Sequence, residues 1–313
     1  MPETGAASKD VIPSRDHVNG ANDSFSTPFG QRITTPVGHK ARLRIREAFP
    51  RLFERAYPAV DPTTPILSVL PLLRFHEIDV LPLSFDASSK QKGVFGFSCL
   101  ARLVKVRPDG VGSFLKRPCE VVSEPLATIR ADRTLASLLN VFLRRRFGFA
   151  RVVESKGAGA LLALPDVLGL YQDGVLVSSL ALEHVGSTAF SMPSRSTVRE
   201  ALVEMFDRRI RRVFISGTHQ FIWDRSIIEH LFSPAMVARA ARPEPEDILA
   251  TPISEIGTTT AKVGDGRMRL REAAALLKVE PGQCLVFNGK VVTPWDIVMK
   301  PWKESKLKIR NNR

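Results

Sequence analysis

One arrangement occurs four times in the 313 residues, and this internal repeat constrains the fold more than any other feature. Each copy has an amphipathic helix, two short apolar strands and a second helix that follows the last strand directly. The apolar stripes of the first helices are Ile66, Val69, Leu70 and Leu73; Leu135, Leu138, Leu139 and Phe142; Val198, Ala201, Leu202, Met205 and Phe206; and Leu270, Ala273, Ala274 and Leu277. One copy alone buries too little apolar surface, so we expect the copies to pack in pairs.

The junction between the last strand and the second helix is clearest in the fourth copy, within residues 289–298. Thr293 stands at the expected N-cap, Pro294 at the first helical position and Asp296 at the third. Superposing the four junctions gives one equivalent position, occupied by Arg102, Asp166, Ser226 and Asp296. Two interpretations of Thr293 and Asp296 stay open. They form either a capping box that only stabilises the helix start, or a carboxylate site for two ribose hydroxyls.

The charge balance is the one unusual bulk property, because 45 Lys and Arg against 32 Asp and Glu give a net charge of +13. Such an excess favours anionic partners: nucleotides, nucleic acid or acidic protein surfaces. A hydrophobic content of 44% with 25% charged residues is typical of a soluble globular protein. No apolar run approaches the ~18 residues of a membrane span, so we predict no membrane partner. The N-terminus lacks the features of a signal peptide.

The sequence shows no pattern of catalytic chemistry. The three cysteines, Cys99, Cys119 and Cys284, lack metal-ligand spacing and indicate a reducing cytoplasm. The six histidines are scattered, and neither a phosphate-binding glycine loop nor a nucleophile elbow follows a strand. We therefore predict a cytoplasmic protein that is not an enzyme and needs no metal cofactor.

The repeats leave a segment at each end of the chain. Residues 1–40 lack apolar periodicity and are expected to form a disordered or loosely docked tail, and residues 41–57 a basic helix. We place the copies at 58–118, 119–185, 186–242 and 250–302, which gives pairs over 58–185 and 186–302. For the basic segment 303–313, a solvated tail is favoured over an anion-binding arm.

The copies share four features in series: a leading strand such as 260–263, an amphipathic helix such as 270–274, a strand with proline as in 80–83, and a Gly-φ-φ-Thr-x-x-Asp-like junction. This series resembles the CBS domain family over nearly everything after the N-terminal tail. The resemblance implies an α/β (α+β) fold of four β-α-β-β-α repeats, packed as two tandem pairs called Bateman modules.

In that family, clefts between paired copies bind adenosine-containing ligands: AMP, ADP, ATP or S-adenosylmethionine. The resemblance implies that the junction Asp binds the ribose and that a basic residue before the middle strand meets phosphate. Asp296 with Thr293 matches best, whereas Asp166 follows Ala163 in place of Ser or Thr. Arg211 and Arg151 match the phosphate position, and solvated arginines on a basic face are an equally open interpretation. The first and third copies lack a junction carboxylate, so we expect one competent half-site per pair.

Three hypotheses follow. The first is a regulatory adenosine-nucleotide sensor that acts on an unidentified protein effector, with a homodimer possible. The second is a nucleic-acid-binding protein that uses the basic array as a scaffold, supported by the net charge and by the clusters at 144–146 and 208–212. The third is an assembly scaffold that binds no ligand.

Overall fold

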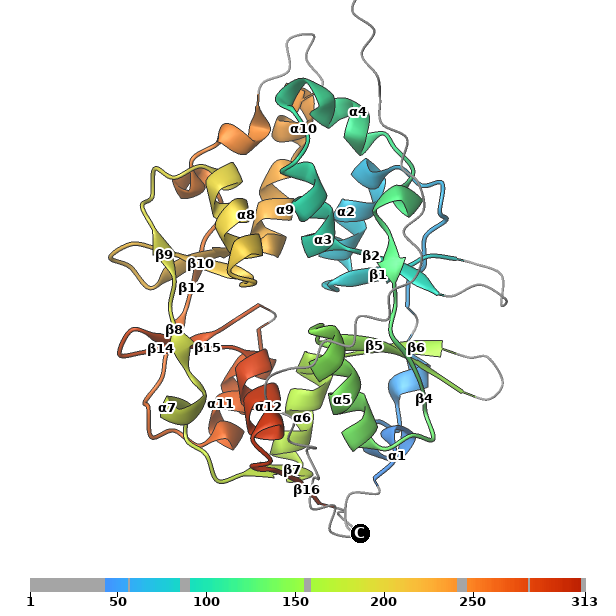
Figure 1. Ribbon diagram of the computed structural model, residues 1–313, viewed down its shortest axis with the longest axis vertical. Helices are drawn as coiled ribbons and strands as arrows, with labels where there is room; N and C mark the ends of the chain where they lie inside the picture. Colours follow the sequence, from blue (N-terminus) through green and yellow to red (C-terminus); the bar gives the residue numbers. More distant parts are fainter. Residues whose placement is uncertain are drawn as a thin grey trace, which may run out of the picture. The chain divides into compact units, whose positions relative to one another are not determined.

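The structure is a computed structural model that describes residues 43–55, 57–84, 91–154, 159–240, 247–280 and 282–310 (Figure 1). These residues belong to one compact unit that spans residues 37–313. The predicted tail over 1–40 lies outside the described residues.

The first repeat contains α2 (Ile66–Phe75), β1 (Val80–Pro82), β2 (Lys92–Phe95) and α3 (Gly96–Leu103). Short helices and one strand lead out of it: η2 (Pro108–Gly110), α4 (Val111–Leu115), η3 (Cys119–Val122) and β3 (Glu124–Pro125). The second repeat contains β4 (Thr128–Arg130), α5 (Leu135–Arg145), β5 (Phe149–Val153), β6 (Gly159–Ala163) and α6 (Leu164–Gln172), followed by β7 (Leu176–Ser178) and α7 (Leu182–Val185).

The third repeat contains β8 (Ser187–Thr188), β9 (Ser191–Met192), α8 (Val198–Asp207), β10 (Arg212–Ile215), β11 (Gln220–Trp223), α9 (Asp224–Leu231) and α10 (Pro234–Ala240). The fourth contains η4 (Ile248–Ala250), η5 (Ile253–Glu255), β12 (Thr259–Thr260), β13 (Lys262–Val263), α11 (Leu270–Lys278), β14 (Leu285–Phe287), β15 (Lys290–Val292) and α12 (Pro294–Lys303). The order of elements confirms the predicted mixed α/β repeat.

The predicted apolar stripes are the buried faces of α2, α5, α8 and α11. Every stripe residue is buried except Phe206, which is partly buried at the end of α8. The start of α8 is fixed by a capping box: Thr197 Oγ1 accepts from the Glu200 N–H at 3.2 Å, and Glu200 Oε2 accepts from the Thr197 N–H at 2.8 Å. Local periodicity and capping therefore account for these helices.

The two repeats of the second pair share the strands that precede their first helices. In the segment 187–192, β8 pairs with β15 of the fourth repeat, whereas β9 pairs with β10 of the third. The segment 259–263 is also divided between the two sheets, because β12 pairs with β11 of the third repeat and β13 pairs with β14 of the fourth. The resulting sheets have the orders β12-β11-β10-β9 and β13-β14-β15-β8. Neither repeat of this pair completes its sheet without the other.

Within each pair the two repeats contact each other through their sheets, whereas the two pairs contact each other through helices. In the first pair, the side chains between the sheets are Val80, Phe95, Leu126, Phe149 and Leu161. In the second pair they are Phe214, Phe221, Ala261, Cys284 and Val286. Helices α2 and α3 share one core with α8 and α9, and α5 and α6 share another with α11 and α12 (Figure 1). The first repeat therefore contacts the third through helices, and the second contacts the fourth.

The predicted basic helix over 41–57 is not continuous. Its described part forms α1 (Ile45–Ala48) and a short 3-10 helix, η1 (Leu52–Glu54). Phe49 leaves the helical region at φ −133° and ψ 68°, because the residue before a proline is disfavoured in the helical conformation and Pro50 follows it. Ile45 and Leu52 are buried in the core of the second and fourth repeats.

The first-repeat junction also differs from the prediction. The apolar run 93–99 suggests one long strand, but β2 ends at Phe95 and α3 begins at Gly96. Ser98 therefore takes the third helical position, and Arg102 lies one turn further on, where its guanidinium donates to the Val121 carbonyl at 2.7 Å. Apolar residues continue beyond the end of β2 because Cys99, Leu100 and Leu103 form the buried face of α3.

Residues 307–309 of the basic C-terminal segment form a strand that packs on the protein, whereas the sequence favours a solvated tail. Strand β16 (Leu307–Ile309) pairs antiparallel with β7. Leu307 and Ile309 are buried, whereas Lys306, Lys308 and Arg310 are exposed. The period-2 alternation of a strand thus anchors the segment on one face and turns its cations outward on the other.

We expect Leu307→Ala to lower the free energy of unfolding by about 2 kcal/mol, because it removes a buried side chain from the contact between β16 and the helical core. Chemical denaturation followed by circular dichroism measures the change. Lys308→Ala, on the exposed face of the same strand, should shift stability by less than about 0.5 kcal/mol. Equal effects of the two substitutions would show that β16 does not dock.

Candidate functional site

The fourth-repeat carboxylate, Asp296, is at the third position of α12 and is 7% exposed. Its Oδ2 accepts from the Thr293 N–H at 2.9 Å and from the Thr293 hydroxyl at 2.8 Å, so the capping interaction is present. Its Oδ1 lies 3.2 Å from Lys300 Nζ and 3.5 Å from Ser187 Oγ. Because Ser187 begins β8, Oδ1 faces the seam between α12 and the shared segment 187–192.

The second-repeat carboxylate, Asp166, has a partner from outside the repeat. Its Oδ2 accepts from the Ala163 N–H at 2.9 Å, and its Oδ1 forms an ion pair with Arg55. The hydrogen bond and the charge of Asp166 raise the pKa of the Arg55 guanidinium above its ordinary value. The segment before the first repeat therefore already supplies a cation to Asp166.

Arg211 joins the first repeat to the third. Its Nη1 and Nη2 donate to the two oxygens of Asp79 at 3.0 and 2.9 Å, and its Nε and Nη2 donate to Asp224 Oδ2 at 3.1 and 2.6 Å. Asp224 is the first residue of α9, and its side chain is only 3% exposed. Both carboxylate partners of Arg211 therefore lie in the first and third repeats, and its role in binding phosphate stays a prediction.

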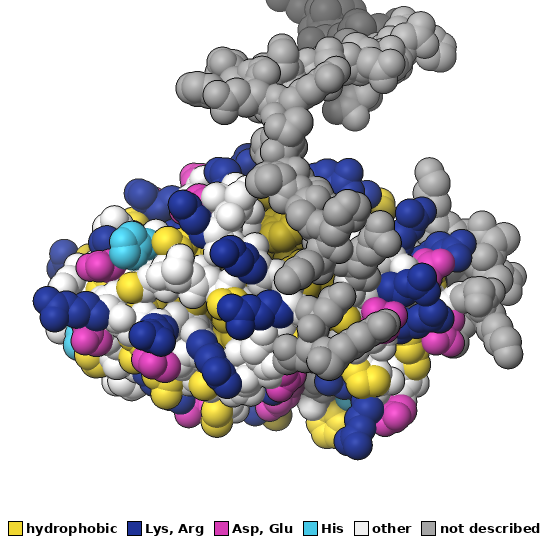
Figure 2. All heavy atoms as spheres, turned by 90° about the horizontal axis from the view of Figure 1, so that it is seen from below, with side chains coloured by type: hydrophobic (Ala, Val, Ile, Leu, Met, Phe, Trp, Pro, Cys, Tyr) yellow, Lys and Arg dark blue, Asp and Glu magenta, His cyan; other side chains and the backbone are white. Residues whose placement is uncertain are grey.

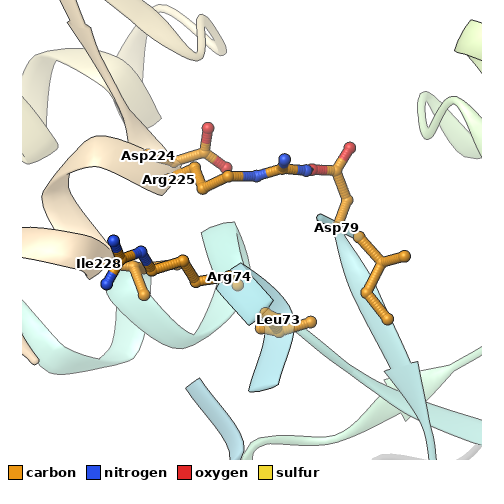
Figure 3. Close-up of a pocket in the computed structure, with 8 residues that line it drawn as sticks. Leu73, Arg74, Asp79, Asp224, Arg225 and Ile228 are labelled. Carbon is orange, nitrogen blue, oxygen red and sulfur yellow. The ribbon is translucent and has the colours of Figure 1, made fainter. Parts of the chain in front are cut away.

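Arg225 completes this network. Its guanidinium points toward Asp79, as Figure 3 shows, at 3.3 Å from Oδ1. Burial alone would raise the pKa of Asp79, but the charges of Arg211 and Arg225 outweigh it and hold that pKa well below its usual range. The cavity beside the network, lined by α2, α3 and α9, has a volume of about 10 Å³. That is room for about one water molecule and not for a nucleotide.

Arg212, which the sequence places only within the basic cluster 208–212, is a further candidate site residue. Its Nε and Nη2 donate to the Gly282 carbonyl of the fourth repeat at 3.0 and 2.8 Å. Burial lowers the pKa of Arg212, and the charge of Asp296 is among those that oppose this shift. Strand alternation could have identified it, because Arg212 shares a face of β10 with Phe214, which packs between the two sheets.

Arg151, the other arginine predicted to meet phosphate, lies in the middle of β5 and is partly buried. Its side chain lies over Gly159 of β6, so close that a Cβ at Gly159 would approach Arg151 Nε to 2.7 Å. Arg151 and Asp166 both belong to the second repeat, on β5 and α6.

The third-repeat junction carries Trp223 where the fourth carries Thr293. The indole lies against Gly282, and a Cβ there would come within 2.3 Å of the ring. Gly282 also has a φ of +80°, which favours glycine. The Arg225 guanidinium stacks on the indole at 4.9 Å from the ring centroid. The chain's own aromatic side chain therefore fills this junction.

The described residues contain neither a metal-binding cluster nor a membrane-spanning helix. None of their His, Cys, Asp and Glu side chains form a group of three or more that could hold a metal ion. No helix in these ranges combines the length and apolarity that crossing a membrane requires.

No family model and no curated protein matches the sequence. Among solved structures, a protein from Methanocaldococcus jannaschii, proposed to be an archaeal homologue of γ-AMPK, matches with a TM-score of 0.71 and 14% identity over 82% of this chain and 99% of that chain. The chain has the CBS-domain fold. A CBS-domain protein from Agrobacterium tumefaciens matches 41% of this chain (92% of its own) with 17% identity and a TM-score of 0.35. A CBS domain protein from Pyrobaculum aerophilum complexed with AMP matches 40% (89% of its own) with 16% identity and a TM-score of 0.32.

We expect Arg211→Met to destabilise this CBS array by about 3 to 5 kcal/mol, because it leaves Asp224 buried without its cation. Arg74→Met removes a pair with Glu229 in which both side chains are about half exposed, and it should cost less than about 1 kcal/mol. Chemical denaturation compares the two variants. A loss for Arg211→Met no larger than that for Arg74→Met would contradict the structural role of the network.

The lowered pKa of Asp79 predicts a pH dependence of stability. The folded state holds this carboxyl ionised below the ordinary value of about 3.9, so the unfolded state binds the proton first. The stabilisation that Asp79 contributes to the folded state is present above about pH 3.9 and is lost as the pH falls below that value. Melting temperatures of the wild type should therefore fall more steeply than those of Asp79→Asn as the pH is lowered below about 4, and parallel curves would contradict this account.

Proposed function

We propose that this four-repeat CBS protein is a regulatory protein that binds an adenosine-containing ligand, AMP, ADP, ATP or S-adenosylmethionine, and acts on a partner protein. The observation that carries the proposal is the environment of Asp296. One oxygen caps α12, while the other faces the seam, where it lies 3.5 Å from Ser187 Oγ and 3.2 Å from Lys300 Nζ. A ribose diol would take the place of the Lys300 and Ser187 contacts on Oδ1.

The fourth repeat is favoured over the second because of what holds each carboxylate. Lys300 lies on the same helix as Asp296, four residues on, and its side chain is 32% exposed. Lys300 Nζ also donates to the Val185 carbonyl and, at 2.8 Å, to Ser187 Oγ, so the lysine keeps acceptors when a ligand takes its place beside Asp296 Oδ1. Asp166 is instead paired with Arg55, and Ala163 stands at its N-cap, so only the fourth-repeat junction has the full Thr-x-x-Asp pattern.

The cation for the ligand phosphate would come from the same pair. Arg212 reaches the fourth repeat through its hydrogen bonds to the Gly282 carbonyl, so it is favoured over Arg211, whose guanidinium is bound by two carboxylates. Charge-assisted hydrogen bonds to phosphate would be worth more than its present bonds to a neutral carbonyl. Arg151 stays a candidate for the second repeat.

Regulation follows from the position of the site. Ser187 lies on the segment whose strands complete both sheets of the second pair. A ligand between Asp296 and this segment would favour one arrangement of the two repeats, by its difference in affinity for the alternatives. A protein effector that contacts this pair would detect that shift.

Nucleic-acid binding is the second candidate. Figure 2 shows Lys and Arg side chains over much of the face seen from below, with Asp and Glu between them. Lys306, Lys308 and Arg310 add three exposed cations on one side of β16. Against it, Arg211 and Arg212 of the predicted cluster 208–212 are bound within the protein and are not free for phosphates.

A thermal-shift panel of AMP, ADP, ATP, S-adenosylmethionine and single- and double-stranded oligonucleotides tests the proposal. We expect at least one adenosine ligand to raise the melting temperature, because it binds the folded state alone. Asp296→Asn, which keeps the size of the side chain, should weaken that ligand at least tenfold in calorimetric titration.

Asp166→Asn is the matched control, since it makes the same change at the third position of the second-repeat helix. It should leave the affinity unchanged. An affinity that does not respond to Asp296→Asn, or a panel in which only oligonucleotides bind with strong salt dependence, would overturn the proposal.

A further inference from the structure

A groove of about 550 Å³ opens at the outer edge of the second pair, between the turns of two β-hairpins. One turn joins β10 to β11 in the third repeat, and the other joins β14 to β15 in the fourth (Figure 1). Gly217 and Gly289 lie in these turns, and a Cβ on either would meet nothing within 4 Å. The space between the hairpins is therefore open, and its volume falls in the range of small-molecule sites.

The floor of this groove is apolar. Phe214 and Phe287, one from each repeat, line it together with Ile215 and Val286. These four side chains are 5 to 8% exposed, so packing holds them in place. Val263, by contrast, lines the groove and is 68% exposed, so its side chain adds accessible apolar surface to the groove.

The rim is polar and lacks acidic side chains. Ser191, Thr218, His219, Asn288 and Lys290 line it, and none of the described lining residues is Asp or Glu. Lys290 Nζ donates to the Glu183 carbonyl at 3.1 Å, which leaves two of its three protons for a ligand. A protein with a net charge of +13 also raises the local concentration of anions.

The groove is distinct from the clefts at the helix junctions. Both repeats contribute equivalent parts to it, the ends of β10 and β14 and the turns that follow them. Asp296, Thr293, Arg212 and Trp223 are not among its lining residues. A ligand here would bridge the two hairpins and would not touch the carboxylate proposed for ribose.

We propose that this groove binds a small organic anion with a flat apolar body, and does so independently of the adenosine site. The aromatic rings of Phe214 and Phe287 and the side chain of Val263 cover the apolar body. Lys290, with His219 and Asn288 on the same rim, receives the anionic group. Neither half alone forms the site, because each phenylalanine comes from a different repeat.

Fluorescence titration of the full chain with anilinonaphthalene sulfonate tests this inference, because the probe combines a flat apolar body with one negative charge. We expect one saturable site. Val263→Asp puts a carboxylate on the rim and should weaken the probe at least tenfold. Val279→Asp is the matched control: Val279 is 74% exposed, lies outside the groove and should have no effect.

Two further measurements separate the inference from non-specific adsorption and from the proposed function. Lys290→Met should weaken the sulfonate probe but leave uncharged phenylnaphthylamine, which has the same body, unaffected. Asp296→Asn should leave the probe titration unchanged. Absence of saturation, equal effects of Val263→Asp and Val279→Asp, or a loss of probe binding in Asp296→Asn would overturn the inference, and none of these outcomes depends on whether adenosine ligands bind.

Discussion

The structure depends on strands that each pair of repeats holds in common. In the second pair, the segments 187–192 and 259–263 each give one strand to either sheet, so the two sheets are bound together by backbone hydrogen bonds as well as by apolar packing. A single repeat would leave these strand edges and the side chains between the sheets exposed. The shared segments also set the position of the candidate site, since Ser187 beside Asp296 lies on one of them.

The chain's own side chains occupy the other junctions, and this makes the four repeats unequal. Arg55 pairs with Asp166, Trp223 fills the third-repeat junction, and Arg211 is held between Asp79 and Asp224. Asp224 is buried with Arg211 as its cation, so separating the first repeat from the third would leave an uncompensated charge inside the protein. Asp296 differs because its outer partner is a partly exposed lysine on the same helix.

Periodic features could be predicted from the sequence, because they are decided by neighbours along the chain. The stripes of α2, α5, α8 and α11 and the box at Thr197 are of this kind. Features decided by tertiary contacts could not. The run 93–99 is apolar on both sides of the point where β2 ends and α3 begins, so hydrophobicity does not mark the boundary. Strand β16 has only two buried residues, and the six Lys and Arg residues around it favour a solvated segment when the sequence is read alone. Alternation along β10 places Arg212 on the same face as Phe214, but it does not show that the acceptor is the Gly282 carbonyl or that Arg211 meets Asp79 of the first repeat.

The most direct test of the account is a crystal structure of the full chain grown with AMP. It should show the ribose hydroxyls within hydrogen-bonding distance of Asp296 Oδ1, with Lys300 turned away and the Thr293 cap on Oδ2 intact. An intact ion pair between Lys300 and Asp296, with AMP absent or bound at another junction, would contradict it.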